Sequence, residues 1–374
     1  MRHQSPQNQR RGRLRTYVIR FALLLLLLVF IGVNAVAGMQ ARSMTHFVPP
    51  NELPPAGETR SPIGQFWATL SGQPIPRPEN QETPANLGYD YETHTITLPG
   101  GEWLEAWWIA HPQPQGVVLL FPGYTAGKEQ LLRPAQIFHE LGYSTFLVDF
   151  RGVGGSSGSV TFLGIREAKD VAHAVDYVRQ TWPGQPVLLY GTSMGSSALL
   201  RAVAREGVQP QAVIAEAPFA RLSDAVDARV RSMRVPTFPA SELLLFWGSV
   251  QLGANAFTHN PAEYAPDVTC PTLLLRGAED ARVAAAEIDA IYQGLAGPKA
   301  RISVPHVGHE LLLPQTPEVR QQVEQFLDQH ATRMPAHRAR SGAWYFAPGE
   351  SWRRLPAPAQ FPAGSADRRV KSET

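Results

Sequence analysis

Residues 186–205 read PVLLYGTSMGSSALLRAVAR and place a serine between two glycines. The apolar run before the first glycine predicts a buried strand, and the alanine- and leucine-rich run after the second predicts a helix. A turn this tight strains the backbone of its middle residue, so that both neighbouring positions must be small. Gly191 and Gly195 meet this requirement. The segment therefore predicts that Ser193 projects from the edge of a sheet as a nucleophile.

A serine hydroxyl becomes a nucleophile only when a base takes its proton and a carboxylate orients that base. Asp280 follows the predicted strand 272–275, and His309 follows the predicted strand 301–304. Catalytic groups of parallel sheets collect at the carboxyl ends of the strands. We therefore expect Ser193, His309 and Asp280 to form a catalytic triad.

Three other side chains compete for these roles. Glu279 is adjacent to Asp280 but would point the other way, and Glu216 follows a different strand and would suit a variant triad. His306 precedes His309 by three residues and is expected to support the site or lie at the surface. Asp280 and His309 remain the preferred acid and base, with Glu216 as the alternative acid.

Acyl transfer also requires hydrogen-bond donors where negative charge develops on the attacked oxygen. The backbone N–H of Met194, at the start of the predicted helix, is one expected donor. The second is the backbone N–H of Tyr124, in the loop Phe121-Pro122-Gly123-Tyr124 that follows a predicted strand. Gly123 lets this loop approach the serine closely.

The middle of the chain alternates short apolar runs with helical patterns. Between residues 165 and 180, for example, apolar residues recur at intervals of three and four. Buried strands that alternate with amphipathic helices predict an α/β fold with a mostly parallel sheet covered on both faces. A hairpin around Pro99-Gly100-Gly101 is predicted to precede this part. The expected strands that follow are 117–121, 145–150, 187–190, 212–215, 272–275 and 300–304.

Six motifs follow one another between Tyr89 and His330: Phe121-Pro122-Gly123-Tyr124, the loop Asp149–Ser156, the Ser193 turn, Ala217-Pro218-Phe219, the loop Gly277–Val283 and Gly308-His309. Together they resemble the α/β-hydrolase superfamily, and within it the serine-aminopeptidase-like and lipase-like esterase branch. The resemblance implies a mainly parallel sheet of about eight strands and a triad in the chain order serine, acid, histidine. Many members carry histidine at the position of Pro122, but a backbone donor does not require it.

The alternation of strands and helices breaks for nearly fifty residues after Phe219. The superfamily that the chain resembles commonly carries an insertion here that covers the serine, so we expect a small helical cap at about 221–267. Leu244, Phe246 and Trp247 lie in its most apolar part and are candidates for lining an acyl pocket. Contact with a bilayer and simple packing on the domain are the alternatives.

The N-terminal region contains the uninterrupted apolar stretch FALLLLLLVFIGV at 21–33, which reaches eighteen residues when 34–38 are included. That length is near the lower limit for a transmembrane helix. Six arginines precede the stretch and only Arg42 follows soon after it, which predicts a cytoplasmic N-terminus and an extracytoplasmic remainder. Ala35-Val36-Ala37 fits signal peptidase, so secretion after cleavage is the alternative.

Charge is distributed unevenly along the chain, although the formal total is only +2. Residues 1–20 carry six arginines and no acidic residue, and residues 331–374 carry eight basic and three acidic residues. Residues 21–330 carry twenty basic and twenty-nine acidic residues. This acidic body argues against nucleic acid as a partner.

The predicted organisation has five parts. A basic cytoplasmic segment is followed by a transmembrane anchor or signal peptide, a proline-rich tether that is either extended or wrapped on the domain, an α/β-hydrolase domain and a disordered basic tail. Their boundaries are 1–20, 21–38, 39–88, 89–332 and 333–374.

The composition limits the chemistry further. The chain has 374 residues and 44% of them are apolar, which suffices for a sizeable core. Its single cysteine excludes an intramolecular disulfide and leaves a zinc ribbon unsupported. The acidic residues do not cluster at metal-ligand spacing, so that no metal and no cofactor are expected.

The sequence thus predicts a membrane-anchored serine hydrolase. It would cleave an ester, thioester or amide bond of a small acyl or peptide-like substrate through an acyl-enzyme, with Ser193 as nucleophile. A non-catalytic α/β-hydrolase scaffold and an acyltransferase that uses the same residues are the alternatives. Nothing in the sequence predicts an oligomeric state.

Overall fold

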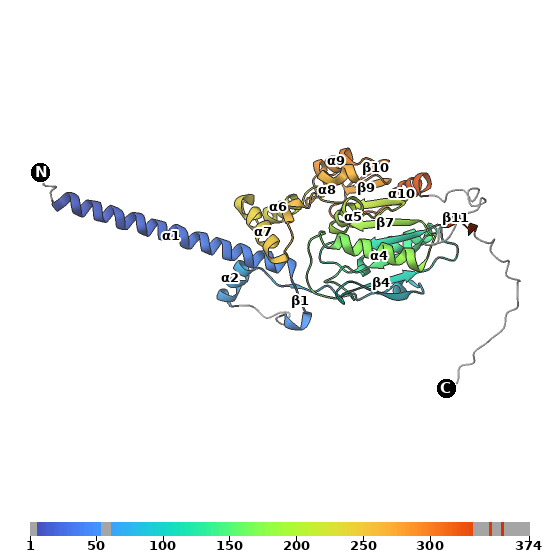
Figure 1. Ribbon diagram of the computed structural model, residues 1–374, viewed down its shortest axis with the longest axis horizontal. Coiled ribbons are helices and arrows are strands. Elements are labelled where there is room, and N and C mark those ends of the chain that lie inside the picture. Colours follow the sequence, from blue (N-terminus) through green and yellow to red (C-terminus); the bar gives the residue numbers. More distant parts are fainter. Residues whose placement is uncertain (1–5, 54–60, 332–343, 346–352, 355–374) are drawn as a thin grey trace, which may run out of the picture. The chain divides into compact units, whose positions relative to one another are not determined.

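A sheet of eight strands forms the centre of the protein (Figure 1). The computed structural model describes residues 6–53, 61–331, 344–345 and 353–354. The eight strands are β3 (Glu92–Thr97), β4 (Trp103–Ile109), β5 (Val117–Phe121), β6 (Ser144–Val148), β7 (Val187–Thr192), β8 (Ala212–Glu216), β9 (Thr272–Gly277) and β10 (Lys299–Val304). They lie in the order β10-β9-β8-β7-β5-β6-β4-β3. All neighbours from β10 to β6 are parallel, and the β4–β3 hairpin is antiparallel. The predicted α/β fold class and mostly parallel sheet are confirmed.

Helices cover both faces of this sheet, as its apolar strands require. In β5, Val117 and Leu119 face one hydrophobic cluster, and Val118 and Leu120 face the other. The first cluster is completed by α4, α5, α8 and α9, and the second by α3 and α10. The bounds are α3 (Leu132–Glu140), α4 (Glu167–Thr181), α5 (Met194–Arg205), α8 (Pro261–Tyr264), α9 (Ala285–Gly294) and α10 (Pro317–His330).

A single helix, α1 (Pro6–Thr45), includes the predicted apolar span and extends beyond it on both sides. At 1.5 Å per residue its 40 residues measure about 60 Å. The side chains of residues 14–33 are all exposed, and the helix is long and apolar enough to cross a membrane. Its last turns contact the rest of the protein.

The proline-rich segment after α1 lies against the domain and is not an extended tether. Its strands β1 (Phe47–Val48) and β2 (Ile75–Pro76) pair with each other, and α2 (Pro62–Ser71) packs beside α1. Arg77 then donates hydrogen bonds to carbonyls of the loop after β6. These contacts fasten the segment that follows α1 to the loop after β6.

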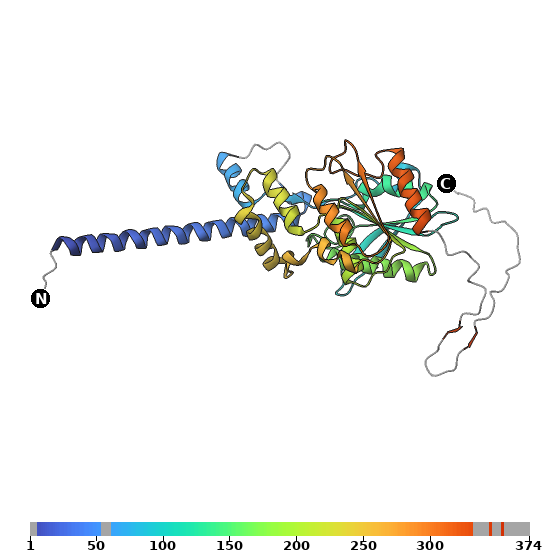
Figure 2. The ribbon, with the colours of Figure 1, turned by 90° about the horizontal axis from the view of Figure 1, so that it is seen from above.

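The inserted segment forms helices α6 (Leu222–Ser232) and α7 (Thr237–Leu252), followed by the short helix η4 (Ala256–Thr258). Residues 221–258, hereafter the cap, have a small apolar core of their own. The expected cap boundary at about 267 also includes α8, which packs into the main core through Tyr264. Both views show α6 and α7 beside the last turns of α1 (Figures 1 and 2).

The predicted tail is described only at two short strands, β11 (Trp344–Tyr345) and β12 (Arg353–Arg354), which pair antiparallel. The rest of the tail lies outside the described residues, and the tail forms a unit separate from residues 1–332.

Candidate active site

The turn between β7 and α5 exposes Ser193 at the carboxyl edge of the sheet. Ser193 has φ 51° and ψ −116°, a conformation that side-chain-bearing residues rarely adopt. A Cβ atom on Gly195 would lie 2.5 Å from the carbonyl oxygen of Pro122, and one on Gly191 would lie 2.9 Å from three atoms of α5. Both glycines are therefore required by the close approach of the backbone, as the sequence predicts.

The structure brings together the three side chains that the sequence selects. The Nε2 atom of His309 lies 3.0 Å from the hydroxyl oxygen of Ser193, and its Nδ1 atom lies 2.7 Å from Oδ2 of Asp280. A carboxylate only accepts hydrogen bonds, so Nδ1 carries the proton and Nε2 is free to accept one from the serine. The arrangement can remove the Ser193 proton during nucleophilic attack.

Asp280 is held in a fixed orientation by its own loop. Its Oδ1 atom accepts hydrogen bonds from the amides of Arg282 at 2.7 Å and Val283 at 2.9 Å. Burial raises the pKa of this carboxyl, but the hydrogen bonds from His309 and from the two amides outweigh burial and leave the pKa below its usual value. Asp280 is therefore ionised at neutral pH and accepts the hydrogen bond from Nδ1 of His309.

The competing residues take other places. His306 and Glu279 contact each other at 3.1 Å at the surface, where their side chains are 91% and 63% exposed. The Glu216 carboxylate, which the sequence offers as the alternative acid, contacts neither His309 nor Ser193 among the contacts of the described residues. It accepts hydrogen bonds from the amides of Leu312 and Leu313 instead.

Glu216 thus holds the loop that carries His309. The two amide bonds measure 2.9 and 2.8 Å, and the side chain is buried. Burial raises its pKa to about 7, against the opposing effect of the two amides. The carbonyl of the same residue accepts the Ser193 amide at 2.7 Å. One residue therefore supports both the nucleophile turn and the histidine loop, a role that the sequence did not reveal.

The loop after β5 lies beside the serine. A Cβ atom on Gly123 would lie 3.6 Å from the Cβ of Ser193, which is ordinary van der Waals contact. Tyr124 and Met194, the two expected oxyanion donors, line the same pocket as Ser193 and His309. The Tyr124 hydroxyl donates a 2.6 Å hydrogen bond to the carbonyl of Met44 at the end of α1. Burial raises the pKa of Tyr124 to about 12, so this hydroxyl stays protonated.

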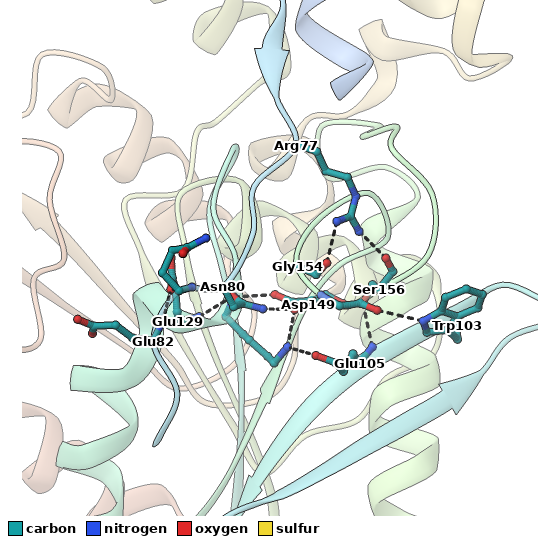
Figure 3. Close-up of polar contacts among 12 residues, drawn as sticks. Arg77, Asn80, Glu82, Trp103, Glu105, Glu129, Asp149, Gly154 and Ser156 are labelled. Carbon is teal, nitrogen blue, oxygen red and sulfur yellow. Dashed lines mark hydrogen bonds and ion pairs between the residues drawn. The ribbon is translucent and has the colours of Figure 1, made fainter. Parts of the chain in front are cut away.

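A buried ion pair fixes the far end of this loop (Figure 3). The Nζ atom of Lys128 lies 2.5 Å from Oδ2 of Asp149, and both side chains are fully buried. Asp149 also accepts hydrogen bonds from the Lys128 amide at 2.6 Å, from Asn80 at 2.7 Å and from the Gly155 amide at 2.9 Å. Three segments thus meet at one carboxylate, whose position in the Asp149–Ser156 motif is the only sequence signal for it.

The site opens into a pocket of about 770 Å³. Apolar side chains from α6 line part of it, together with Met44 from α1 and Arg229 from the cap. Of the three residues predicted to form an acyl pocket, none lines this cavity. Leu244 lines a small apolar cavity nearby, Phe246 is exposed, and Trp247 packs on α1 and donates to Asn34. Phe246 and Trp247 lie away from the serine because α7 turns their side of the helix toward α1 and solvent.

Comparison with known proteins identifies relatives of the described domain. Residues 112–265 match the sequence profile of the family described as serine aminopeptidase, S33. The lysophosphatidylserine lipase ABHD12 of Danio rerio is 25% identical over 201 residues, which cover 49% of this chain and 50% of that protein. The uncharacterised protein YqkD of Bacillus subtilis is 24% identical over 249 residues, which cover 66% and 77%. The chain thus matches only about half of the length of the lipase.

A solved structure shares the fold. The esterase Pf2001 of Pyrococcus furiosus superimposes with a TM-score of 0.58 at 22% identity, over 68% of this chain and 97% of that one. This likeness, the profile match and the strand order observed here agree with the superfamily that the sequence motifs predict. These comparisons support the assignment of the described domain to the α/β-hydrolase superfamily.

Proposed function

We propose that this protein is a membrane-anchored serine hydrolase that cleaves an ester bond through an acyl-enzyme. The observation that carries the proposal is the unbroken hydrogen-bond chain from Ser193 through His309 to Asp280. Such a chain activates a hydroxyl that is otherwise a poor nucleophile. The side chains of His309 and Asp280 are 14% and 0% exposed, so the pair acts in a largely desolvated setting.

In the first half of the reaction, the Ser193 oxygen attacks the substrate carbonyl while Nε2 of His309 takes the hydroxyl proton. The Tyr124 and Met194 amides stabilise the negative oxygen, and Asp280 stabilises the imidazolium. The tetrahedral adduct collapses, the bond to the leaving alcohol breaks, and His309 gives its proton to that alcohol. Water then repeats the sequence on the acyl-enzyme and releases the acid and free Ser193.

An ester is favoured over a thioester or an amide as the substrate bond. Of the three proteins compared above, one is named a lipase and one an esterase, and both names describe ester cleavage. The pocket of about 770 Å³ has room for an acyl chain and a head group, and it combines apolar side chains with Arg229. An acylated amphiphile fits this combination better than a short peptide.

Membrane anchoring is the second half of the proposal. Residues 14–33 of α1 expose their side chains, which soluble proteins avoid over such a long apolar segment. The arginine-rich start favours a cytoplasmic N-terminus, with the catalytic domain outside the cytoplasm. Reporters fused to the C-terminus of the full chain test this orientation. Alkaline phosphatase is active only outside the cytoplasm, so that fusion is expected to be active. Green fluorescent protein fused at the same point is expected to stay dark.

Hydrolysis of p-nitrophenyl esters tests the catalytic half. The full chain in detergent is expected to turn over these esters, and Ser193→Ala is expected to remove turnover without changing the unfolding temperature. Retained turnover in that variant would mean that another group is the nucleophile. A series of acyl chain lengths then measures how long a chain the pocket accepts.

A further inference from the structure

Exposed apolar side chains outside α1 concentrate on α2 and the cap. Among the described residues after 45, the exposed large apolar side chains are Ile63, Trp67, Trp103, Met233, Val235, Phe238, Phe246, Val250 and Phe257. All of them except Trp103 belong to α2 or the cap. Phe238 is 76% exposed and Val250 is 57% exposed. We term the eight listed side chains other than Trp103 the cap–α2 surface.

This surface surrounds the point at which α1 leaves the domain. Gln40 of α1 donates a 2.7 Å hydrogen bond to the Thr69 carbonyl of α2. On α7, Trp247 donates to Asn34 at 3.2 Å, and Gln251 donates to the Gly38 carbonyl at 2.8 Å. Two views at right angles place α2, α6 and α7 along the last turns of α1, with the sheet beyond them (Figures 1 and 2). The apolar surface of α1 therefore continues onto α2 and the cap.

The length of α1 places the cap at the membrane. Among the hydrogen bonds of the described residues, α7 first reaches α1 at Asn34, and the apolar residues 21–33 before it measure about 20 Å. The hydrocarbon core of a bilayer is about 30 Å thick. The uncharged interval from Arg20 to Arg42 measures about 32 Å and matches that thickness, but its last part is the part that α7 contacts. A bilayer that fills this interval must also reach α7.

The turn between α6 and α7 has the composition of an interfacial segment. Met233, Val235 and Phe238 are exposed, and the exposed Arg231 and Arg234 stand between and beside them. Apolar side chains enter the boundary of the acyl layer while arginines contact anionic head groups. Water-facing surfaces of soluble domains rarely collect large apolar side chains in this way.

The active-site pocket adjoins this surface. Met44, Leu222 and Val226 line both the pocket that contains Ser193 and the small apolar cavity between α1 and the cap. Ala41 of α1 and Leu244 of α7 also line that cavity. A continuous set of apolar side chains thus connects the serine with the helices that lie beside the bilayer.

We infer that the cap–α2 surface lies in the interfacial layer of the bilayer spanned by α1, and that the pocket takes an amphiphilic ester from that bilayer. The inference rests on the proposed membrane span. The occupant of the cap–α2 surface is the lipid surface, because its exposed apolar side chains continue those of α1 and arginines lie at their edge. A protein partner on the same surface is the competing occupant that an experiment must separate.

Nitroxide labels at single cysteines test this depth in the full chain. Cys270, the only native cysteine, is replaced by serine, and Leu25→Cys, Phe238→Cys, Val250→Cys or Gln322→Cys is added. Gln322 is exposed on α10, which Figures 1 and 2 show at the end of the domain away from α1. The protein is reconstituted in vesicles of phosphatidylcholine and phosphatidylglycerol. Collisions with oxygen, which enriches in bilayers, and with a water-soluble nickel chelate are compared.

The labels at 25, 238 and 250 are expected to prefer oxygen, and the label at 322 to prefer the nickel chelate. Labels at 238 and 250 that behave like the label at 322, while the label at 25 prefers oxygen, would overturn the inference and leave the anchor intact. Shielding of 238 and 250 from both reagents would show a protein partner and overturn it as well. Preference of the label at 25 for nickel would overturn the anchor, and the inference with it.

Activity provides a second readout. Val250→Glu adds a charge at the proposed depth and is expected to lower hydrolysis of a long-chain ester carried in the same vesicles about tenfold. Gln322→Glu adds the same charge on α10 and is expected to have no effect. Both variants are expected to hydrolyse soluble p-nitrophenyl acetate at the unchanged rate. Equal rates for both variants on the vesicle-borne ester would contradict delivery from the bilayer.

Discussion

The Nε2 atom of His309 lies 3.0 Å from the hydroxyl oxygen of Ser193, although 116 residues separate the two in the chain. Two strands, β8 and β9, lie between their strands β7 and β10 in the sheet. Parallel strands end at the same edge, so the loop after β10 can reach back over this edge to the turn after β7. Glu216, at the end of β8, secures the loop through Leu312 and Leu313. The contact is thus a product of the topology and not of local sequence.

Replacing Asp280 by asparagine is expected to lower kcat for a soluble ester on the order of 10⁴-fold, because the amide favours the wrong tautomer of His309. The matched control is Glu279→Gln, which alters the adjacent pair with the exposed His306 and is expected to change kcat less than about twofold. Comparable losses in the two variants would show that the assignment of the acid is incorrect.

Glu216→Gln is expected to lower kcat while KM changes little, because its carboxylate holds the loop that carries His309. Two amides need acceptors, and a glutamine side chain offers one oxygen and one N–H₂ group. The backbone amide that faces the N–H₂ group loses its acceptor. This loss should lower the free energy of unfolding by about 1–3 kcal/mol, measured by urea denaturation. Unchanged kcat and stability would show that Glu216 does not support the loop that carries His309.

The same carboxyl predicts a pH dependence of stability. Its pKa is about 7 in the folded protein, against an ordinary value of 4.5. Between these two values the unfolded chain releases the proton that the folded chain retains, so the contribution of Glu216 to stability falls as the pH rises through this window. The free energy of unfolding of the wild type, relative to Glu216→Gln, is therefore expected to decrease from pH 4.5 to 7 and then level off. A difference that grows with pH would mean that the folded pKa is not raised.

Lys128→Met is expected to destabilise the protein by about 3–5 kcal/mol, because it leaves the Asp149 carboxylate buried without its cation. Adding Asp149→Asn to that variant should restore part of the loss. The control is Arg205→Met, which removes an exposed ion pair with Asp267 and should cost at most about 1 kcal/mol. Similar losses for Lys128 and Arg205 in urea denaturation would contradict the role of the buried pair.

Two glycines of the site are expected to respond differently to alanine. A Cβ atom on Gly195 meets the backbone oxygens of Pro122 and Phe121 at 2.5 and 2.6 Å, so Gly195→Ala must displace the loop after β5 or the start of α5. Gly123→Ala meets its neighbours at 3.5–3.6 Å and should keep the fold. Thermal unfolding is followed by circular dichroism. A lower unfolding temperature for Gly123→Ala than for Gly195→Ala would exclude this account of the Ser193 turn.

Most of the fold could be predicted from the sequence because its strands are short, apolar and covered on both faces. Strand β5 was predicted with its observed bounds, Val117–Phe121, and β7 was extended only by the two residues that enter the Ser193 turn. Asp280 and His309 could be placed because each directly follows a strand. The strands were predicted from local apolar patterns, and the two site residues from their position after a strand.

The remaining features depend on contacts between distant segments. Lys128 is buried against the carboxylates of Asp149, in the loop after β6, and Glu105, on β4, and nothing near Lys128 in the sequence indicates this. Phe246 and Trp247 were expected in the pocket because α7 is apolar on most of its surface, which gives no signal for the side that faces the serine. The helix packs instead on α1, more than 200 residues earlier, and that partner could not be read from α7 itself.

Labelling with a fluorophosphonate probe tests the central claim that Ser193 is an activated nucleophile. The full chain in detergent is treated with the probe, digested with trypsin and sequenced by mass spectrometry, since residues 180–201 form one tryptic peptide that also contains Ser196 and Ser197. We predict one modified site, Ser193, with labelling lost in Ser193→Ala and strongly slowed in His309→Ala. Folded protein that remains unlabelled, or that is labelled at another serine, would contradict the account.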